Sequence, residues 1–339
     1  MEKVVYILGA GFSAYAGLPL MSNFYIKSKD MYFENIERYK YFQTLFNNID
    51  KMAKIKNYYK ADLFNIEEIL SIMEMQQNIG ETGRLKKEFI KYIVDVVEFY
   101  SPKKDSLCNF DRPSGDWYKY VFGNDKIINE YGNFILSLLN AKLSTAYNDN
   151  YRNIYFSQST LSTEYSIITL NYDLIIENYL SFILKEMSHE NYHELPIYKL
   201  HGCISKGNII PPTWAKSISN DLVDNWKSAF SELVSATKIR IIGYSLPISD
   251  SYIRYFLKSA VIRNERLKEI DIICYDPTNK IEQNYNDFIV FDKKRFQNKK
   301  TEQYLDFSQG SIPYRSNELQ KLVYTYNFFE RHHDNFMLS

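Results

Sequence analysis

The sequence contains few cysteines and no long hydrophobic run. Only three of the 339 residues are cysteines, and Cys108, Cys203 and Cys274 lie far apart in the chain. This spacing excludes a disulfide framework and a paired CxxC zinc clamp, so we expect reduced thiols and no bound metal. No apolar run approaches the roughly 18 residues that a membrane-spanning helix needs, and the charged start MEK is unlike a signal peptide. These absences predict a cytoplasmic protein without a membrane partner.

The sequence also lacks an excess of charge of either sign. Lysine plus arginine and aspartate plus glutamate both number 41. The net charge therefore gives no reason to expect direct binding to nucleic acid or to an anionic membrane. With 45% hydrophobic and 24% charged residues, the composition is that of an ordinary globular protein, long enough for one large domain or two smaller ones.

Apolar runs near the start and in the second half of the chain predict parallel β-strands. Several are rich in β-branched residues, and they lie at 4–9 (VVYILG), 165–171, 196–202, 238–245 and 269–276. Segments with a helical pattern alternate with these runs, at 173–185, at 221–234 and after the expected N-cap Asp250. The alternation predicts an α/β fold built on a Rossmann-like parallel sheet with right-handed crossovers.

Between residues 20 and 147 the pattern is helical, and no strand pattern interrupts it. Asn65 is expected to cap the helix in NIEEILSIMEM together with Glu68, and FIKYIVDVVEFY and NEYGNFILSLLNAKL show the same periodicity. The sequence therefore predicts a large helical insertion after the first βα unit. We expect a core of residues 1–24 and 160–290, an insertion of residues 25–159, and a C-terminal extension of residues 291–339 that could serve as an assembly surface.

Two stretches invite interpretations that their context does not favour. The basic segment FDKKRFQNKK is expected to be a solvated turn rather than a binding patch. The segment HENYH (189–193) fits the HExxH pattern of zinc proteases, but Pro196 leaves little room for a helix there. The next histidine, His201, lies eight residues past His193, where the extended zinc-binding pattern needs six. A surface loop is the preferred interpretation.

The first strand is followed by closely spaced glycines. Gly9, Gly11 and Ala14 match the pattern G-x-G-x-x-[GA], which lets a pyrophosphate approach backbone N–H groups at a helix N-terminus. The same residues could also form a purely structural tight turn. A dehydrogenase would need a second strand that ends in an acidic residue about 20 positions further on, where this chain is helical. Hydride transfer therefore fits the sequence badly.

Four motifs together resemble the sirtuin family. They are GAGFSAYAGLP (9–19), TLNYD (169–173), LHG (200–202) and GYSLP (243–247), each at the end of a predicted strand. The carboxyl ends of parallel strands meet at one edge of a sheet, so the motifs can converge on a single pocket. The resemblance implies that the core binds NAD as a substrate, through Gly9, Ala10, Gly11, Ser13, Pro19, Thr169, Gly243, Ser245 and Asp276.

The resemblance also implies the residues that act on the nicotinamide end. Asn171 would bind near the ribose, Asp173 would receive the carboxamide, and His201 would be the base. Each has a structural alternative: Asn171 and Asp173 could cap the following helix, and His201 could belong to a turn. Asp276 before Pro277 is also a common turn opening. The combination of motifs favours the functional interpretation.

The chain departs from deacetylating sirtuins in one segment. Only 41 residues separate His201 from Gly243, and Cys203 is the only cysteine among them, so the family's small zinc module is absent. The helical insertion, IIPPTW (209–214) and GYSLPISDSYIRYFL look like the sirtuin-like domains of bacterial antiphage defence systems. This resemblance implies an NAD+ hydrolase (NADase) that yields nicotinamide and ADP-ribose and depletes cellular NAD on infection. We expect restraint through homo-oligomer assembly or a partner subunit such as a hexameric ATPase.

Two other functions remain open at the level of sequence. One is a sensor module that binds NAD or ADP-ribose without turnover. The other is an NAD-dependent deacylase or ADP-ribosyltransferase, although loss of the zinc module removes an element that helps to form the peptide cleft.

Overall fold

The computed structural model describes residues 1–54, 65–79, 84–103, 125–145, 154–158, 163–186, 194–211, 220–308, 312–316, 321–325 and 329–339. HENYH, Cys108 and the end of IIPPTW from Pro212 onward lie outside the described residues. Within the described part of the chain, no helix has both the length and the apolar character required to cross a membrane.

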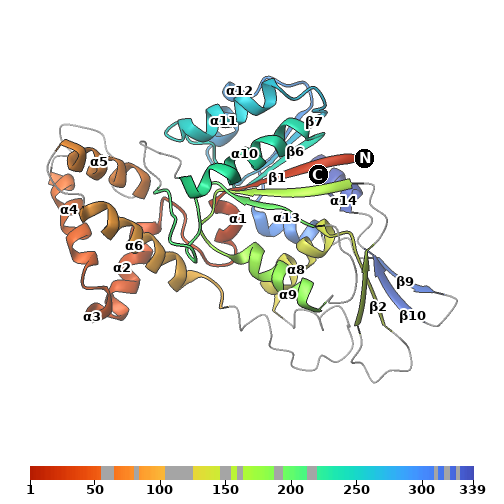
Figure 1. Cartoon of the computed structure of the whole chain (residues 1–339), viewed down its shortest axis with the longest axis horizontal. Coiled ribbons are helices and arrows are strands. Elements are labelled where there is room, and N and C mark those ends of the chain that lie inside the picture. Colours follow the sequence, from red (N-terminus) through yellow and green to blue (C-terminus); the bar gives the residue numbers. More distant parts are fainter. Residues whose placement is uncertain are drawn as a thin grey trace.

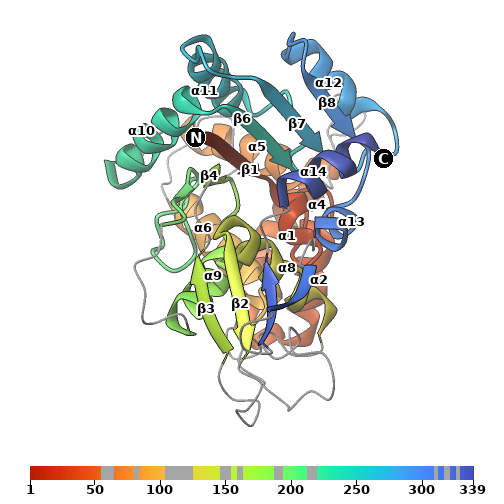
Figure 2. The same ribbon diagram turned by 90° about the vertical axis from the view of Figure 1, so that its right-hand side faces the viewer.

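A six-stranded parallel sheet forms the centre of the molecule (Figures 1 and 2). Its spatial order is β5-β4-β1-β6-β7-β8, and β1 pairs in parallel with β4 and β6. The predicted α/β fold with a Rossmann-like parallel sheet is confirmed. The strands are β1 (Glu2–Leu8), β4 (Thr163–Thr169), β5 (Ile197–Lys199), β6 (Lys238–Ile242), β7 (Glu269–Ile273) and β8 (Lys294–Gln297).

The apolar run in β1 is continuous because both faces of the sheet are covered. Tyr6 and Leu8 belong to one hydrophobic cluster, whereas Val5 and Ile7 belong to another on the opposite face. The face of the sheet that carries Val5 packs against α10 (Asn220–Ser235), α11 (Ser251–Ile262) and α12 (Lys280–Phe288). The face of Tyr6 packs against α8 (Lys126–Leu138), α9 (Ile175–Glu186), α13 (Thr301–Ser308) and α14 (Phe329–Leu338), with the short α1 (Ala10–Ala14) directly after β1.

A helical bundle lies at the far left of the view in Figure 1. The predicted cap by Asn65 at its third long helix is confirmed, because Oδ1 of Asn65 accepts hydrogen bonds from the backbone N–H groups of Glu67 (3.0 Å) and Glu68 (3.4 Å). The part of the Glu68 side chain in this cap stays a prediction. Ring pairs such as Phe42 and Tyr92, with centroids 4.8 Å apart, fill its interior. The bundle consists of α2 (Phe24–Glu34), α3 (Ile36–Tyr39), α4 (Phe42–Lys54), α5 (Ile66–Ile79) and α6 (Arg84–Tyr100).

A second sheet corrects the prediction of an uninterrupted helical stretch up to residue 147. Its strands are antiparallel in the order β3-β2-β10-β9, with β2 (Ala141–Thr145), β3 (Ile154–Gln158), β9 (Ile312–Ser316) and β10 (Lys321–Thr325). The helix predicted through NAKL ends at Leu138, and Asn140 adopts a φ of 48° before β2 begins. The expected insertion and the expected C-terminal extension are thus hydrogen-bonded to each other.

The basic segment FDKKRFQNKK was expected to be a solvated turn, and this prediction is wrong. Lys294–Gln297 forms the edge strand β8, paired in parallel with β7. Arg295 donates to the carboxylates of Asp271 (Nε–Oδ1 2.6 Å) and Glu269 (2.8 Å) on the neighbouring strand. The basic character of this segment suggested a solvated turn. The carboxylates of β7 instead neutralise the charge of Arg295 within the sheet.

Candidate functional site

A cavity of about 660 Å³ lies at the carboxyl ends of the central strands. The loops that follow β1, β4, β6 and β7 all contribute to its lining, as expected for a parallel sheet. Nine of the twelve residues singled out in the sequence line this cavity: Ala10, Gly11, Ser13, Pro19, Asn171, Asp173, His201, Gly243 and Ser245. Gly9, Thr169 and Asp276 are not among the lining residues.

The glycines of the first motif allow two loops to cross in contact. The N–H of Gly11 donates to the carbonyl oxygen of Gly243 at 2.8 Å. A Cβ atom on Gly9 would lie 2.6 Å from that same oxygen, and one on Gly11 would lie 2.8 Å from the Cα of Gly243. Gly243 has a φ of 65°, and its own Cβ would lie 2.3 Å from the N atom of Phe12. The small residues therefore have a packing role at the cavity wall, in addition to any ligand that approaches there.

We expect Gly243→Ala to destabilise the protein by about 3 kcal/mol, because a left-handed backbone and a steric clash act together. Gly207→Ala is the matched control. Gly207 has a φ of 64°, but a Cβ there meets nothing within 4 Å. The control should cost only about 1 kcal/mol. Urea denaturation of both variants measures the difference, and equal losses would contradict the packing role.

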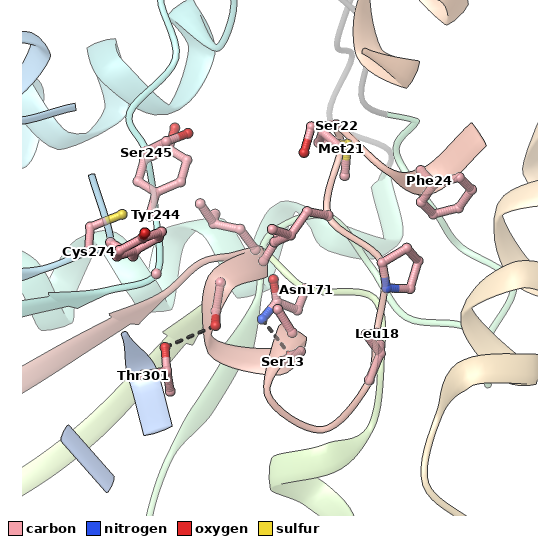
Figure 3. Close-up of a pocket in the computed structure, with 18 of the residues that line it drawn as sticks. Ser13, Leu18, Met21, Ser22, Phe24, Asn171, Tyr244, Ser245, Cys274 and Thr301 are labelled. Carbon is pink, nitrogen blue, oxygen red and sulfur yellow. Dashed lines mark hydrogen bonds between the residues drawn. The ribbon is translucent and has the colours of Figure 1, made fainter. Parts of the chain in front are cut away.

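Asn171 joins the loop after β4 to the first motif. Its Nδ2 donates to the carbonyl oxygen of Gly9 at 2.9 Å. The same Nδ2 donates to Oγ of Ser13, also at 2.9 Å (Figure 3). The Gly9 oxygen is only an acceptor, which assigns the amide orientation and leaves the Oδ1 atom to accept from a ligand. Asn171 is 9% exposed. Asn171 therefore does not cap the following helix, which was its structural alternative. Its side chain instead connects two loops of the site.

Asp173 and Thr169 have local structural contacts. Oδ1 of Asp173 accepts from the N–H of Ile175 at 3.1 Å, at the first residue of α9, so the capping alternative describes this contact. Oγ1 of Thr169, which is buried and does not line the cavity, accepts from the N–H of Asn171 at 3.1 Å. Asp173 nevertheless lines the cavity, and its predicted contact with a carboxamide stays a prediction.

The hydrogen bond of His201 identifies its tautomer. Nδ1 lies 3.1 Å from the carbonyl oxygen of Leu170, which can only accept, so in the neutral ring Nδ1 carries the proton. Nε2 then carries the lone pair of a potential base. The backbone of His201 is held as well, because its carbonyl oxygen accepts from the N–H of Ile210 at 2.9 Å. The side chain lines the cavity and is 6% exposed.

Asp276 caps a helix. Its carboxylate accepts from the backbone N–H groups of Thr278 (3.3 Å), Lys280 (3.1 Å) and Glu282 (2.9 Å) at the start of α12. Burial would raise the pKa of Asp276, but these backbone hydrogen bonds lower it below its usual value. The predicted contact with the adenosine ribose stays a prediction, in which Asp276 would share oxygens already used by the helix.

The cavity is also lined by residues that the sequence motifs did not include. Glu67 of α5 brings a buried carboxylate from the helical bundle, and Asp250 brings another from the start of α11. Oδ2 of Asp250 accepts from the hydroxyl of Tyr244 at 2.8 Å, so its side chain does not make the expected helix cap. Burial, and then the charges of Glu67 and Asp250, raise the pKa of Tyr172 beside them. The only sequence signal for Glu67 was its position after the cap Asn65.

The C-terminal part contributes a further wall of the cavity. Lys300, Thr301 and Glu302, at the start of α13, line it beside the first motif. Nothing in the local sequence pattern marked these residues. Among the residues that the structure describes, no group of three or more His, Cys, Asp or Glu side chains could hold a metal ion.

The arrangement suits a polar, extended ligand and a reaction that needs a base. A glycine-rich turn, an amide oxygen and an imidazole face one cavity, together with buried carboxylates that can stabilise positive charge.

Comparisons with known proteins give a family match for the part of the chain that contains β4 to β8. Residues 165–296 match the family model of the SIR2-like domain. One similar solved structure, from work on the mechanism and regulation of Sir2 enzymes, is 12% identical, with 90% of each chain covered and a TM-score of 0.40. A complex of Sir2 with a p53 peptide and NAD+ is 11% identical over 89% of this chain and 90% of that one, with a TM-score of 0.38. No curated protein matches the sequence.

The matched residues include Asn171, His201 and Gly243, and the parallel sheet joins them to the glycine turn that precedes the matched range. The protein therefore contains a SIR2-like, or sirtuin-like, domain.

Proposed function

We propose that the protein is an NAD+ glycohydrolase that releases nicotinamide and ADP-ribose. The observation that carries the proposal is the convergence of His201, Asn171 and the turn at Gly9–Ser13 on one cavity. The SIR2-like family supports NAD-dependent chemistry. The missing zinc module favours hydrolysis over removal of acyl groups from a peptide.

In the proposed reaction, the bond between the nicotinamide ring nitrogen and the anomeric carbon of the ribose breaks, and its electron pair stays on nicotinamide. The ribose develops oxocarbenium character, which the buried carboxylates that line the cavity stabilise. An oxygen nucleophile bonds to the anomeric carbon, and its proton passes to Nε2 of His201. One water is consumed overall. Asn171 orients the ribose through Oδ1 while its Nδ2 holds the turn at Gly9.

We expect Asn171→Ala to lower nicotinamide release from NAD by at least about a hundredfold, because the variant loses an orienting group and loosens the turn. Asn171→Asp retains the shape and would recover little, since a carboxylate cannot donate to the Gly9 oxygen. Chromatography measures nicotinamide, and calorimetry measures NAD affinity.

The same measurements separate the alternatives. Saturable NAD binding without nicotinamide in any assembly state would identify a sensor. Release that requires an added acyl-peptide or acceptor protein would identify a deacylase or an ADP-ribosyltransferase. Wild-type release by Asn171→Ala would contradict the assigned role.

We further propose that the enzyme acts in antiphage defence in the cytoplasm, where it depletes NAD once infection is sensed. A constantly active NADase would kill its host, so we propose control by self-association or by a partner such as a hexameric ATPase. Full activity of the purified monomer would exclude control by assembly.

A further inference from the structure

Thr301 connects the C-terminal part of the chain to the glycine turn of the site. Its Oγ1 donates to the carbonyl oxygen of Gly11 at 2.9 Å, and the side chain lines the cavity while the residue is 7% exposed (Figure 3). The N–H of Gly11 donates to Gly243 on the other side. Both backbone polar groups of Gly11 are thus hydrogen-bonded. The N–H is bound by the loop after β6, and the carbonyl oxygen is bound by α13.

Helix α13 is held in turn by α14. Tyr304 lies three residues after Thr301, on the same side of α13, and it is fully buried. Its hydroxyl lies 2.9 Å from Nδ1 of His333 and 3.1 Å from the hydroxyl of Tyr6. Its ring also packs edge-on against Phe336 of α14, with centroids 5.2 Å apart.

The hydrogen bonds around Tyr304 have a single consistent direction. Nη1 of Arg240 donates to the Tyr6 hydroxyl at 2.8 Å, so the Tyr6 proton is directed to Tyr304. Nε2 of His333 lies 2.8 Å from Oδ2 of Asp271 and therefore carries the ring proton, which leaves Nδ1 to accept from Tyr304. Burial and the charge of Arg240 lower the pKa of His333 to about 4, in agreement with this neutral tautomer.

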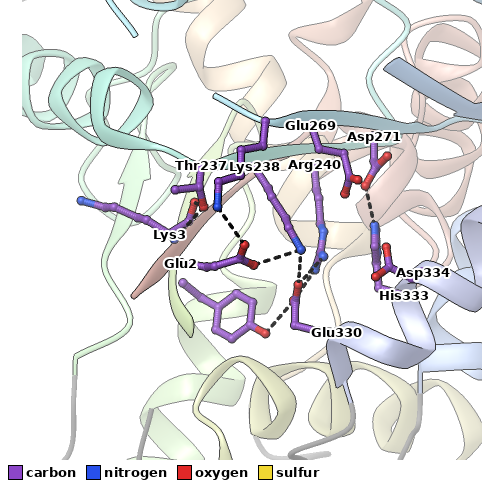
Figure 4. A network of polar contacts seen from close by, with 12 residues as sticks. Glu2, Lys3, Thr237, Lys238, Arg240, Glu269, Asp271, Glu330, His333 and Asp334 are labelled. Atoms are coloured by element: carbon purple, nitrogen blue, oxygen red, sulfur yellow. Dashed lines mark hydrogen bonds and ion pairs between the residues drawn. The ribbon is translucent and has the colours of Figure 1, made fainter. Parts of the chain in front are cut away.

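Helix α14 is anchored to the sheet by ion pairs, one partner of which is buried (Figure 4). Glu330 accepts two hydrogen bonds from Arg240 (2.8 and 2.7 Å) and one from Lys238 (3.2 Å), both on β6. The side chain of Arg240 is fully buried. These contacts hold α14 against the sheet, and the contacts of Tyr304 with His333 and Phe336 hold α13 against α14.

We propose that Thr301 is a positioning residue for the turn at Gly9–Ser13, and that α14 keeps Thr301 in place through the contacts of Tyr304. The C-terminal helix then sets the affinity of the site for NAD. The inference rests on the proposed function for the identity of the ligand. A subunit contact that displaced α14 would change NAD binding, which gives control by assembly a physical route.

The test compares Thr301→Val, which removes the hydroxyl at nearly constant shape, with Thr301→Ser, which retains it. We expect Thr301→Val to raise the Kd for NAD about tenfold by calorimetry, and Thr301→Ser to stay within about twofold of the parent. A His201→Ala background keeps NAD intact during the titration. Hydrogen exchange of the amides in residues 9–15, without NAD, should be about tenfold faster in Thr301→Val.

Tyr304→Phe tests the link to α14, because it removes the hydroxyl and retains the ring. It should weaken NAD binding in the parent but add little in the Thr301→Val background. Unchanged exchange and unchanged Kd in Thr301→Val would overturn the positioning role, and additive effects of the two substitutions would overturn the link to α14.

The exchange measurement separates this inference from the proposed function. A protein that binds no NAD, or releases no nicotinamide in any assembly state, yet shows faster exchange in Thr301→Val would refute the hydrolase while the positioning role stands.

Discussion

Replacing His201 by alanine is expected to lower nicotinamide release from NAD by about a hundredfold to ten-thousandfold, the range typical of a lost general base. The reason is the tautomer: with Nδ1 bound to the Leu170 oxygen at 3.1 Å, Nε2 holds the lone pair that accepts the proton. The measurement is nicotinamide release in the active assembly state, with circular dichroism to verify the fold.

His332→Ala is the matched control, since His332 is a partly exposed histidine that does not line the cavity. It should release nicotinamide at the parent rate. NAD binding by His201→Ala should persist, because the turn at Gly9–Ser13 and Asn171 remain in place. If His201→Ala turns over NAD like the parent, His201 is not the base.

Replacing Glu330 by glutamine is expected to lower the free energy of unfolding by about 3 kcal/mol, the largest stability effect that we anticipate outside the glycine turn. The substitution leaves Arg240, whose side chain is fully buried, without the carboxylate to which it donates twice. Urea denaturation at pH 7 measures the loss. Lys227→Met, which removes an exposed partner of Asp224, is the control and should change stability by less than about 1 kcal/mol.

The pH dependence of unfolding gives a second, independent check on Glu330. Burial alone would raise its pKa, but the charge of Arg240 and its hydrogen bonds outweigh burial and lower the pKa from 4.5 to about 2. A depressed folded-state pKa contributes stability that is fully present above pH 4.5 and is lost as the pH falls to about 2.

Glu330→Gln should therefore show a shallower loss of stability between pH 4.5 and pH 2 than the parent. Some slope remains, because hydrogen bonds from Arg295 and His333 also depress the pKa of Asp271 against the effect of burial. An identical slope in parent and variant would show that the ion pair with Arg240 does not depress the pKa of Glu330.

The sequence by itself determined five of the six strands of the central sheet and most of the residues that line the cavity. Strand runs such as 4–9, the alternation with helices, and the cap at Asn65 depend on residues only a few positions apart, so a local pattern is sufficient to predict them. Because the strands are parallel, their carboxyl ends share one edge, and motifs far apart in the chain could be assigned to one cavity before any coordinates were known.

Only the tertiary structure decided which polar groups are already used by the fold. Asp276 and Asp173 resemble ligand contacts in sequence, yet their carboxylates accept backbone hydrogen bonds at α12 and α9. Asn171, with the same capping alternative, instead connects two loops. The residue type is identical in both interpretations, and only the partner in space distinguishes them.

Tertiary structure also decided which remote segments of the chain contact one another. The pairing of β2 with β10, the strand β8 in a basic segment, and the contact of Thr301 with Gly11 all join residues that are remote in sequence. Such contacts depend on long-range packing and charge compensation, as between Arg295 and Asp271, and leave no periodicity in the local sequence. The sequence therefore determined the part of the cavity formed by the loops at the carboxyl ends of the strands. Long-range contacts decided which residues of α5 and α13 complete its lining.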